Sequence, residues 1–177
     1  GDNIFHGKKL IKYINQAKSN LQNENSTIFG VQVDNPSDFG VVEFDGIGNV
    51  ISIKEKPKNP KSNLIVSGIY FYKNNVKEFL PKIKPSKRGE LEITDINNYF
   101  LKRGSLKIIK LDKEISWIDT GTYSSLIKAS KYFENYEIKS GKKAACSEEI
   151  AYNLGYIDKK KLLKIYRSMK KSEYGKY

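Results

Sequence analysis

Four short stretches of the sequence carry side chains whose types suit chemistry on phosphate groups. They are Asp2 in GDN, Glu55 and Lys56 in EKP, Arg88 in KRGELEITD, and Asp119 in WIDTG. Each stretch alone is weak evidence, because a carboxylate in a turn usually caps a helix or forms an Asx turn. Together they supply two carboxylates that can hold Mg²⁺ and two cations that can neutralise phosphate oxygens. This set of groups is typical of phosphoryl or nucleotidyl transfer.

The stretch IDTGTYSS offers a second interpretation, because Asp-Thr-Gly is also the signature of aspartic proteases. Those enzymes are nearly all β, and their two carboxylates come from paired copies of the motif. Here a helix is expected directly after the motif and no second copy exists, so we reject a protease. His6 has no Ser or Cys partner at a recognisable spacing and is interpreted as a loop or packing residue. Cys146 is expected to pack, and Trp117 is expected to wedge its turn against the core.

The expected helices follow from apolar residues at helical spacing and from capping signals. They cover residues 8–21, 74–80, 89–104 and 122–138. The third should start at Thr94 or an earlier residue and stop at Gly104. Thr122 is a plausible N-cap of the fourth. Ser147 and Asp158 resemble the caps of two further short helices near the C-terminus.

The expected strands are rich in β-branched and aromatic residues. They cover residues 26–33, 41–45, 50–56, 63–72 and 106–111. GIGN predicts a hairpin between the second and third of them. The nearly all-apolar run 63–72 is typical of a strand at the centre of a sheet. WIDTG is expected to be a turn.

The alternation of strands and helices predicts an α/β fold with a hairpin insertion around residues 41–56. Ligands of open α/β sheets bind at the carboxyl ends of strands, and GDN before a helix resembles such an end. We therefore expect a strand upstream of Gly1. The chain would then be the second half of a larger α/β domain.

Composition restricts the class of protein further. The net charge of +12 favours anionic partners, but lysines are scattered through every segment, which favours a generic solvated surface. A single cysteine rules out an intramolecular disulfide and indicates a reducing compartment. No apolar run approaches the roughly 20 residues of a membrane span, and no leader is seen. We expect a cytoplasmic protein that binds neither nucleic acid nor membrane.

In order and spacing, the stretches GDNIFHG, FGVVEFD, ISIKEKPKNPKSN, VSGIYFY, KPSKRGELEITDIN and SWIDTGTYSSLIKAS resemble the glucose-1-phosphate thymidylyltransferase family of sugar nucleotidyltransferases. CSEEIAYNLGYID and SEYGKY resemble the C-terminal helical segment of that family. The resemblance implies a mixed, mostly parallel Rossmann-like sheet with a β-hairpin insertion and C-terminal helices. Residues 1–139 would form the sugar-phosphate-binding portion of the nucleotidyltransferase domain, and 140–177 the C-terminal helical segment.

The resemblance also implies substrates and residue roles. The substrates would be glucose 1-phosphate and dTTP, and the product dTDP-glucose would enter dTDP-rhamnose and deoxysugar biosynthesis. The family forms tetramers, so a homo-oligomer is expected. Asp2 and Asp119 would hold Mg²⁺, Lys56 would contact the sugar phosphate, and Arg88 would lie near the phosphates. The residues expected to contact or line the sugar are Gly40, Glu55, Val66 and Tyr70.

The sequence departs from the family pattern at several points. Phe39 stands where the family usually has Tyr, and Ser67 stands where it often has Thr. The glycine-rich nucleotide loop, with its catalytic arginine and lysine, would lie upstream of Gly1. We therefore expect this chain to be inactive alone.

Two other functions remain open from the sequence. One is a non-catalytic half-protein that binds sugar phosphate and needs a partner chain. The other is a basic nucleic-acid binder, which the order of the motifs disfavours. A binder of that kind would lose its affinity between low and moderate salt.

Overall fold

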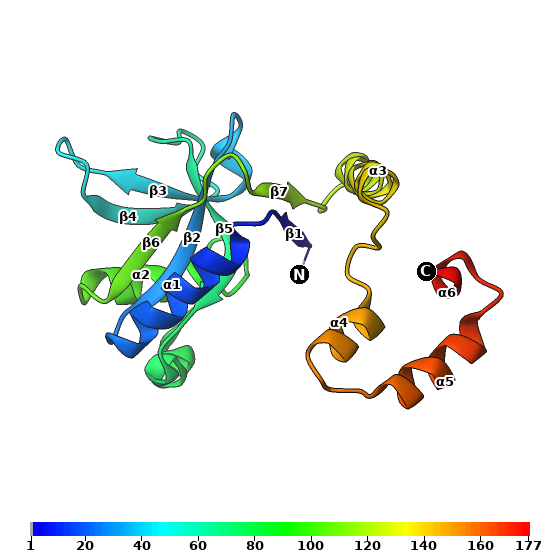
Figure 1. Ribbon diagram of the computed structural model, residues 1–177. Helices are drawn as coiled ribbons and strands as arrows, with labels where there is room; N and C mark the ends of the chain where they lie inside the picture. The colour runs from blue at the N-terminus through cyan, green and yellow to red at the C-terminus, as the bar shows by residue number, and fades with distance from the viewer. Residues whose placement is uncertain (1) are drawn as a thin grey trace. The chain divides into compact units, whose positions relative to one another are not determined.

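The computed structural model describes residues 2–177, and the chain divides into two compact units, Gly1–Asp119 and Thr120–Tyr177 (Figure 1). Gly1 lies outside the described residues. The domain boundary expected from the sequence lies after residue 139. The helix between the two positions groups with the C-terminal unit.

The first unit is built on a five-stranded sheet in the order β4-β3-β5-β2-β6. Its strands are β2 (Ser26–Gln32), β3 (Gly40–Phe44), β4 (Val50–Glu55), β5 (Leu64–Phe71) and β6 (Leu106–Lys110). All five were predicted within two residues at each end. The apolar strand β5 lies in the middle of the sheet, as its sequence predicted, because it can bury both of its faces.

The α/β class and the mixed character of the sheet are confirmed, but the expectation of mostly parallel pairing is wrong for the described strands. Only β2 and β6 run parallel. The pairs β2–β5, β3–β4 and β3–β5 are antiparallel. The physical reason is that β5 runs antiparallel to both of its neighbours, β2 and β3, and the β3–β4 hairpin adds a further antiparallel pair at the edge of the sheet.

A second, two-stranded sheet joins sequence positions more than a hundred residues apart. Strand β1 (Asn3–His6) pairs antiparallel with β7 (Ser116–Asp119), and Asn3 lies opposite Asp119 (Figure 1). The prediction that WIDTG is only a turn is therefore wrong, and β1 was not predicted. Four residues are too few for a periodic signal, so long-range pairing determines both strands.

A bulge in β5 is where the β1–β7 ribbon touches the large sheet. Residues 67–69 of β5 face the single β2 residue Phe29. The indole Nε1 of Trp117 donates to the Ser67 carbonyl at 3.0 Å, and the Ser67 hydroxyl donates to the Phe29 carbonyl. Gly68 has a φ of +94°, and a Cβ at that position would lie 3.0 Å from Nδ2 of Asn3. Trp117 thus wedges the ribbon against the sheet, as predicted.

Helices cover the two faces of the large sheet. Helix α1 (Leu10–Gln22) packs Ala17 against Phe29 on one face. Helix α2 (Ile93–Lys102) packs Phe100 against Ile28 on the other. Because successive residues of a strand point to opposite faces, Ile28 and Phe29 assign the two helices to opposite sides. Residues 74–80, expected as a helix, form two 3₁₀ segments (Asn74–Glu78 and Leu80–Lys82), because Pro81 cannot continue an α-helical turn.

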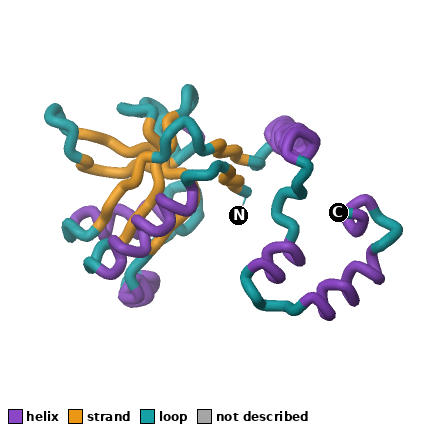
Figure 2. Tube along the Cα trace, viewed as in Figure 1, coloured by secondary structure: helices purple, strands orange, loops and turns teal. Residues whose placement is uncertain are grey.

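The second unit is entirely helical (Figure 2). Its helices are α3 (Tyr123–Ser140), α4 (Ser147–Asn153), α5 (Lys159–Met169) and α6 (Glu173–Lys176). Thr122 caps α3 through a capping box with Ser125, and Asp158 caps α5, both as predicted. The prediction for Ser147 is off by one residue, since Cys146 occupies the N-cap of α4.

A buried carboxylate holds the β3–β4 hairpin together. The Glu43 side chain is only 5% exposed, accepts from the Ser52 hydroxyl at 2.5 Å and pairs with Lys54 at 3.1 Å. The Ser52 bond and the Lys54 charge outweigh burial and lower the pKa of Glu43 below its usual 4.5. Ionised Glu43 therefore stabilises the fold above its unfolded-state pKa, and this stabilisation is lost as pH falls through the folded-state pKa.

We expect Glu43→Gln to lower the free energy of unfolding by about 1 kcal/mol at pH 7, because a charge-assisted hydrogen bond is lost. The difference from the wild type should shrink as the pH is lowered below 4.5. Urea unfolding of both proteins at several pH values measures this, with exposed Glu78→Gln as the control. A difference that does not change with pH would contradict the assigned role.

Candidate active site

The two aspartates predicted to share a metal ion come from neighbouring strand ends of the β1–β7 ribbon. Asp119 ends β7 opposite Asn3, and Asp2 directly precedes Asn3. The Asn3 amide donates to Oδ1 of Asp2 at 3.0 Å. Asp119 is half-buried and Asp2 is exposed. The structure therefore brings the backbone positions of two aspartates that are far apart in the sequence to adjacent strand ends.

The residues expected to read the sugar lie on the α2 face of the sheet. Gly40 and Glu55 are cross-strand neighbours on β3 and β4. A Cβ on Gly40 would lie 3.3 Å from Oε2 of Glu55 and 3.4 Å from Oγ1 of Thr94. Gly40 thus leaves room for the Glu55 carboxylate, which accepts a hydrogen bond from the Thr94 hydroxyl in the first turn of α2.

Tyr70 and Val66 belong to the same face and pack in the core cluster around α2. Burial and then the negative charge of Glu55 raise the pKa of Tyr70 to about 12, because both disfavour the phenolate. Tyr70 therefore stays neutral at physiological pH. Val66 is only 8% exposed, so as the sheet stands it contributes apolar packing.

Lys56 follows β4 in a strained backbone conformation. Its φ of +40° is uncommon for a residue with a side chain, and its N–H donates to the Phe39 carbonyl at 3.0 Å. The side chain is exposed, and no ion pair to it is found among residues 2–177. Strain of this kind persists where the surroundings impose it and is frequent at functional sites. The backbone of Lys56 is thus fixed at the end of β4, and its exposed ammonium group is accessible to an anion.

An aromatic contact connects the Lys56 turn to the aspartate ribbon. Phe39, whose carbonyl holds the Lys56 N–H, packs edge-on against Trp117 with 5.4 Å between ring centroids. Trp117 lies two residues before Asp119 on β7, and side chains two apart on a strand share a face. The cation and the second carboxylate are therefore positioned by one connected set of contacts.

Arg88 lies among carboxylates. Its guanidinium is 2.7 Å from Glu90, 3.3 Å from Glu92 and 3.9 Å from Glu55. The predicted role near the phosphates remains a prediction, because these contacts place the cation beside Glu55 and against acidic partners. The geometry makes Arg88 a neighbour of the Glu55 carboxylate.

Thr94 was expected only as a helix start, and its hydrogen bond to Glu55 was not predicted. The signal that could have found it is its place in the first turn of α2, where a hydroxyl often meets an acceptor. Asn3 and Ser67 were also missed as residues that shape the site. Their roles depend on the contact of the β1–β7 ribbon with β5, which no local sequence pattern predicts.

The donor set is compatible with a magnesium ion held jointly by protein and substrate. Among residues 2–177 there is no group of three or more Asp, Glu, His or Cys side chains that could hold a metal. Asp2 and Asp119 offer carboxylate oxygens, and Mg²⁺ commonly binds one or two carboxylates and keeps its other positions for water and phosphates. The residues present therefore fit this metal better than a metal that needs a full protein cage.

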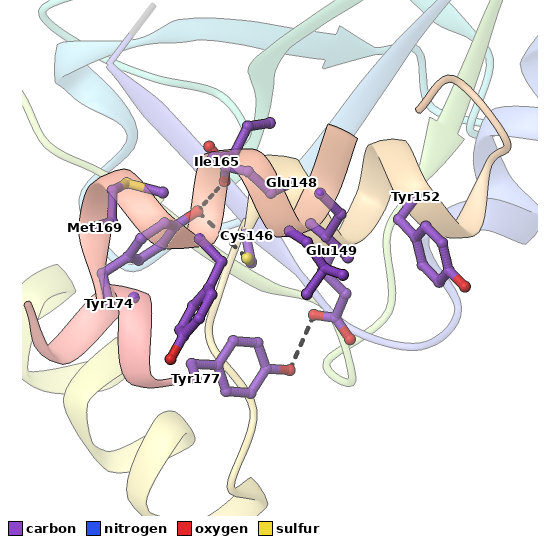
Figure 3. A pocket seen from close by; sticks show the side chains of 12 residues that line it. Cys146, Glu148, Glu149, Tyr152, Ile165, Met169, Tyr174 and Tyr177 are labelled. Atoms are coloured by element: carbon purple, nitrogen blue, oxygen red, sulfur yellow. Dashed lines mark hydrogen bonds between the residues drawn. The ribbon is translucent and has the colours of Figure 1, made fainter. Parts of the chain in front are cut away.

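The C-terminal unit contains a separate cavity of about 460 Å³ between α4, α5 and α6 (Figure 3). Tyr174 donates to Glu148 and lies 3.3 Å from the sulfur of Cys146, while Tyr177 donates to Glu149 at 2.9 Å. These contacts raise the pKa of Tyr174 and lower that of Glu148. Cys146 is buried, which agrees with the packing role expected for it. The polar groups of this cavity bind one another.

Comparison with solved structures defines the class of the fold. A structure from Bacillus anthracis, described as a candidate glucose-1-phosphate thymidylyltransferase in complex with sucrose, is 41% identical. It aligns over 74% of this chain and 51% of its own, with a TM-score of 0.63. A UDP-glucose pyrophosphorylase complexed with UDP-glucose aligns over 76% of this chain and 54% of its own, with a TM-score of 0.66. At 23% identity the second likeness concerns the fold alone.

The family model for nucleotidyl transferases matches residues 1–136, and the chain belongs to that family. Curated relatives named glucose-1-phosphate thymidylyltransferase include one from Xanthomonas campestris, 42% identical, and one from Neisseria meningitidis, 43% identical. Both alignments cover all of this chain, which spans 59% and 61% of the relatives' lengths. In residues 2–177 we find no helix that is long and apolar enough to cross a membrane.

We expect Thr94→Val to lower the free energy of unfolding by about 1 kcal/mol, because the Glu55 carboxylate loses its hydroxyl donor in a half-buried site. Thr94→Ser keeps the hydroxyl and should therefore keep most of the wild-type free energy of unfolding. Urea unfolding of the three proteins measures the effect. A loss in the Ser variant with little loss in the Val variant would show that the methyl group, rather than the hydrogen bond, is what matters.

Proposed function

We propose that this chain is the sugar-phosphate-binding portion of a glucose-1-phosphate thymidylyltransferase. The reaction would join glucose 1-phosphate to dTTP and give dTDP-glucose and pyrophosphate. The observation that supports the proposal is the β1–β7 ribbon, in which Asp119 lies opposite Asn3, the residue that follows Asp2. The names of the curated relatives, at 42–43% identity, support the choice of substrates.

The chemistry follows from the charges in the site. A sugar 1-phosphate is already ionised, so its oxygen needs no general base to attack the α-phosphorus of the nucleotide. The task of the protein is to align two polyanions that repel each other and to stabilise charge in the transition state. Lys56 would hold the attacking phosphate through its exposed ammonium group. Arg88 is predicted to lie near the phosphates, although its present partners are carboxylates.

The sugar would be oriented by groups on the α2 face. Glu55, fixed by Thr94, can accept hydrogen bonds from sugar hydroxyls. The backbone of Gly40 can approach the hexose because no side chain intervenes, and Val66 and Tyr70 would form the apolar wall. Asp2 and Asp119 would hold Mg²⁺, which when bound offsets negative charge on the phosphate oxygens.

Further parts of the proposal concern the protein that contains this chain. We infer cytoplasmic location, assembly into a homotetramer, no nucleic-acid or membrane partner, and a place in dTDP-rhamnose or deoxysugar biosynthesis. These inferences come from the family resemblance of the sequence. The positions of Asp2 and Asp119 on the β1–β7 ribbon, and of Gly40 and Glu55 on the α2 face, do not depend on these inferences.

A second candidate is a half-protein that binds sugar phosphate and works with a partner chain. The observation that supports it is that Gly40, Glu55 and Lys56, which are proposed to contact the sugar phosphate, all lie on the β3–β4 hairpin and the turn after it. Under this alternative the chain binds glucose 1-phosphate and has no activity until a separate nucleotide-binding chain is added. Activity that depends on adding that separate chain would distinguish the two candidates.

The proposal can be tested in a chimera in which the upstream part of the Neisseria meningitidis relative precedes Gly1. We expect Asp119→Asn to lower kcat by at least about 100-fold, because a metal carboxylate is lost. The melting temperature should change by less than about 2 °C. Steady-state pyrophosphate release and thermal unfolding measure the two effects.

Asp112→Asn is the matched control. This aspartate binds Lys9 and Tyr13 and lies away from the sugar face. The control should therefore lower the melting temperature and leave kcat nearly unchanged. If Asp119→Asn instead lost stability and activity in proportion, the metal-binding role of Asp119 would be refuted.

A further inference from the structure

The segment between Ser86 and Glu92 is a compact loop that ends at the start of α2. The Ser86 N–H donates to the Glu90 carbonyl at 2.8 Å, and the Gly89 N–H donates to the Ser86 carbonyl at 2.9 Å. Gly89 has a φ of +78°, a conformation that side chains disfavour. The loop therefore has a defined shape in which Arg88 lies at the tip.

Within this loop, Glu92 is a largely buried carboxylate with two donors. Its side chain is 11% exposed, compared with 60% for Glu90. Oε1 accepts from the Ser86 hydroxyl at 2.7 Å and from Nη1 of Arg88 at 3.3 Å. The Ser86 oxygen in turn accepts from the Arg88 N–H at 3.1 Å. Glu92 therefore binds the guanidinium of Arg88 directly. It also holds the backbone of Arg88 indirectly, through the Ser86 hydroxyl.

Arg88 in turn contacts Glu55, which lies on the α2 face of the sheet. The same Nη1 atom that contacts Glu92 lies 3.9 Å from Oε1 of Glu55. The other oxygen of Glu55, Oε2, accepts from Thr94. One oxygen of Glu55 thus accepts a hydrogen bond from a hydroxyl, and the other forms an ion pair with a cation that is itself bound to Glu92.

We propose that Glu92 is a positioning residue that acts through Arg88 to orient the Glu55 carboxylate for recognition of sugar hydroxyls. This inference rests on the proposed function and adds to it. It gives Arg88 a second task beside the one proposed near the phosphates, which is to fix the Glu55 carboxylate, and it gives Glu92 the task of holding Arg88 in place. A carboxylate that must accept hydrogen bonds from a sugar gains affinity when its orientation is fixed before binding.

The sign of one substitution separates positioning from simple electrostatics. Glu92→Gln removes a negative charge close to a site for an anion. If only the field of Glu92 mattered, the variant would bind glucose 1-phosphate more tightly, and salt would screen the gain. If Glu92 positions Arg88 and Glu55, the variant binds glucose 1-phosphate more weakly at any salt concentration.

The experiment compares two probes, glucose 1-phosphate and inorganic phosphate, titrated into the 177-residue chain and followed by NMR chemical shifts. We expect Glu92→Gln and Arg88→Gln each to weaken glucose 1-phosphate binding about 5- to 10-fold, because oriented hydrogen bonds to a charged group are lost. Glu92→Gln should leave the affinity for inorganic phosphate nearly unchanged, because both cations remain, whereas Arg88→Gln should weaken it. Lys56→Gln should weaken binding of both probes.

A double variant tests whether the two residues act as one unit. In the Arg88→Gln background, Glu92→Gln should have no further effect on glucose 1-phosphate affinity, because its route to Glu55 is already broken. Glu90→Gln should have a smaller effect than Glu92→Gln, since Glu90 is exposed. The control Glu114→Gln removes an exposed carboxylate that pairs with Lys9 at 2.6 Å, and should match the wild type.

The outcomes separate failure of this inference from failure of the proposed function. A wild-type chain that binds neither probe would overturn both. If the wild type binds and Lys56→Gln weakens binding, but Glu92→Gln binds as tightly or more tightly, only the inference is overturned. Loss of inorganic phosphate binding in Glu92→Gln would also overturn it, because Glu92 would then act on the phosphate end of the site rather than on Glu55.

Discussion

The pairing of β1 with β7 is the constraint on which the site depends. It joins residues near the start of the first unit to its last residues, and it sets Asn3 opposite Asp119. The ribbon itself is too short to be stable alone, since two strands of four residues bury little surface. Its support comes from the bulge in β5, where Trp117 bonds to Ser67 and Asn3 approaches Gly68. The aspartates are therefore positioned by the centre of the large sheet.

The charges of the site are arranged in two regions. Lys56 is exposed on a strained turn, whereas Arg88 is surrounded by Glu55, Glu90 and Glu92. An anionic group entering the site would meet an open cation at Lys56 and a neutralised one at Arg88. Hydroxyl groups would meet the Glu55 carboxylate, whose two oxygens are both restrained. Under the proposed function, this asymmetry would give a sugar phosphate one preferred orientation.

Much of the fold could be predicted from the sequence, because the large strands and helices carry strong periodic patterns. Strand β5 was recognised as central from its apolar run, and Thr122 and Asp158 were recognised as caps. The β1–β7 ribbon could not be predicted, since four-residue strands have no usable period. The mostly parallel pairing was wrong because β5 runs antiparallel to both of its neighbours. Local pattern does not encode strand direction.

The candidate site was predictable as a set of residue types but not as a set of contacts. Asp2, Glu55, Lys56 and Asp119 were selected for their chemistry, and their positions on adjoining elements agree with that selection. The partners that hold them, such as Thr94 and Glu92, depend on how α2 meets the sheet. Arg88 illustrates the limit most clearly. Its charge suggested a phosphate contact, whereas its surroundings are three carboxylates.

The central claim, that one divalent ion is held by two aspartates distant in sequence, can be measured directly with paramagnetic Mn²⁺ as a substitute for Mg²⁺. Mn²⁺ broadens the NMR signals of nuclei close to it, so its position can be read from the affected amides. We predict selective broadening at Asn3, Gly68 and Asp119, and its loss in Asp119→Asn. Broadening confined to another acidic region, such as Glu148 and Glu149 on α4, would contradict the account.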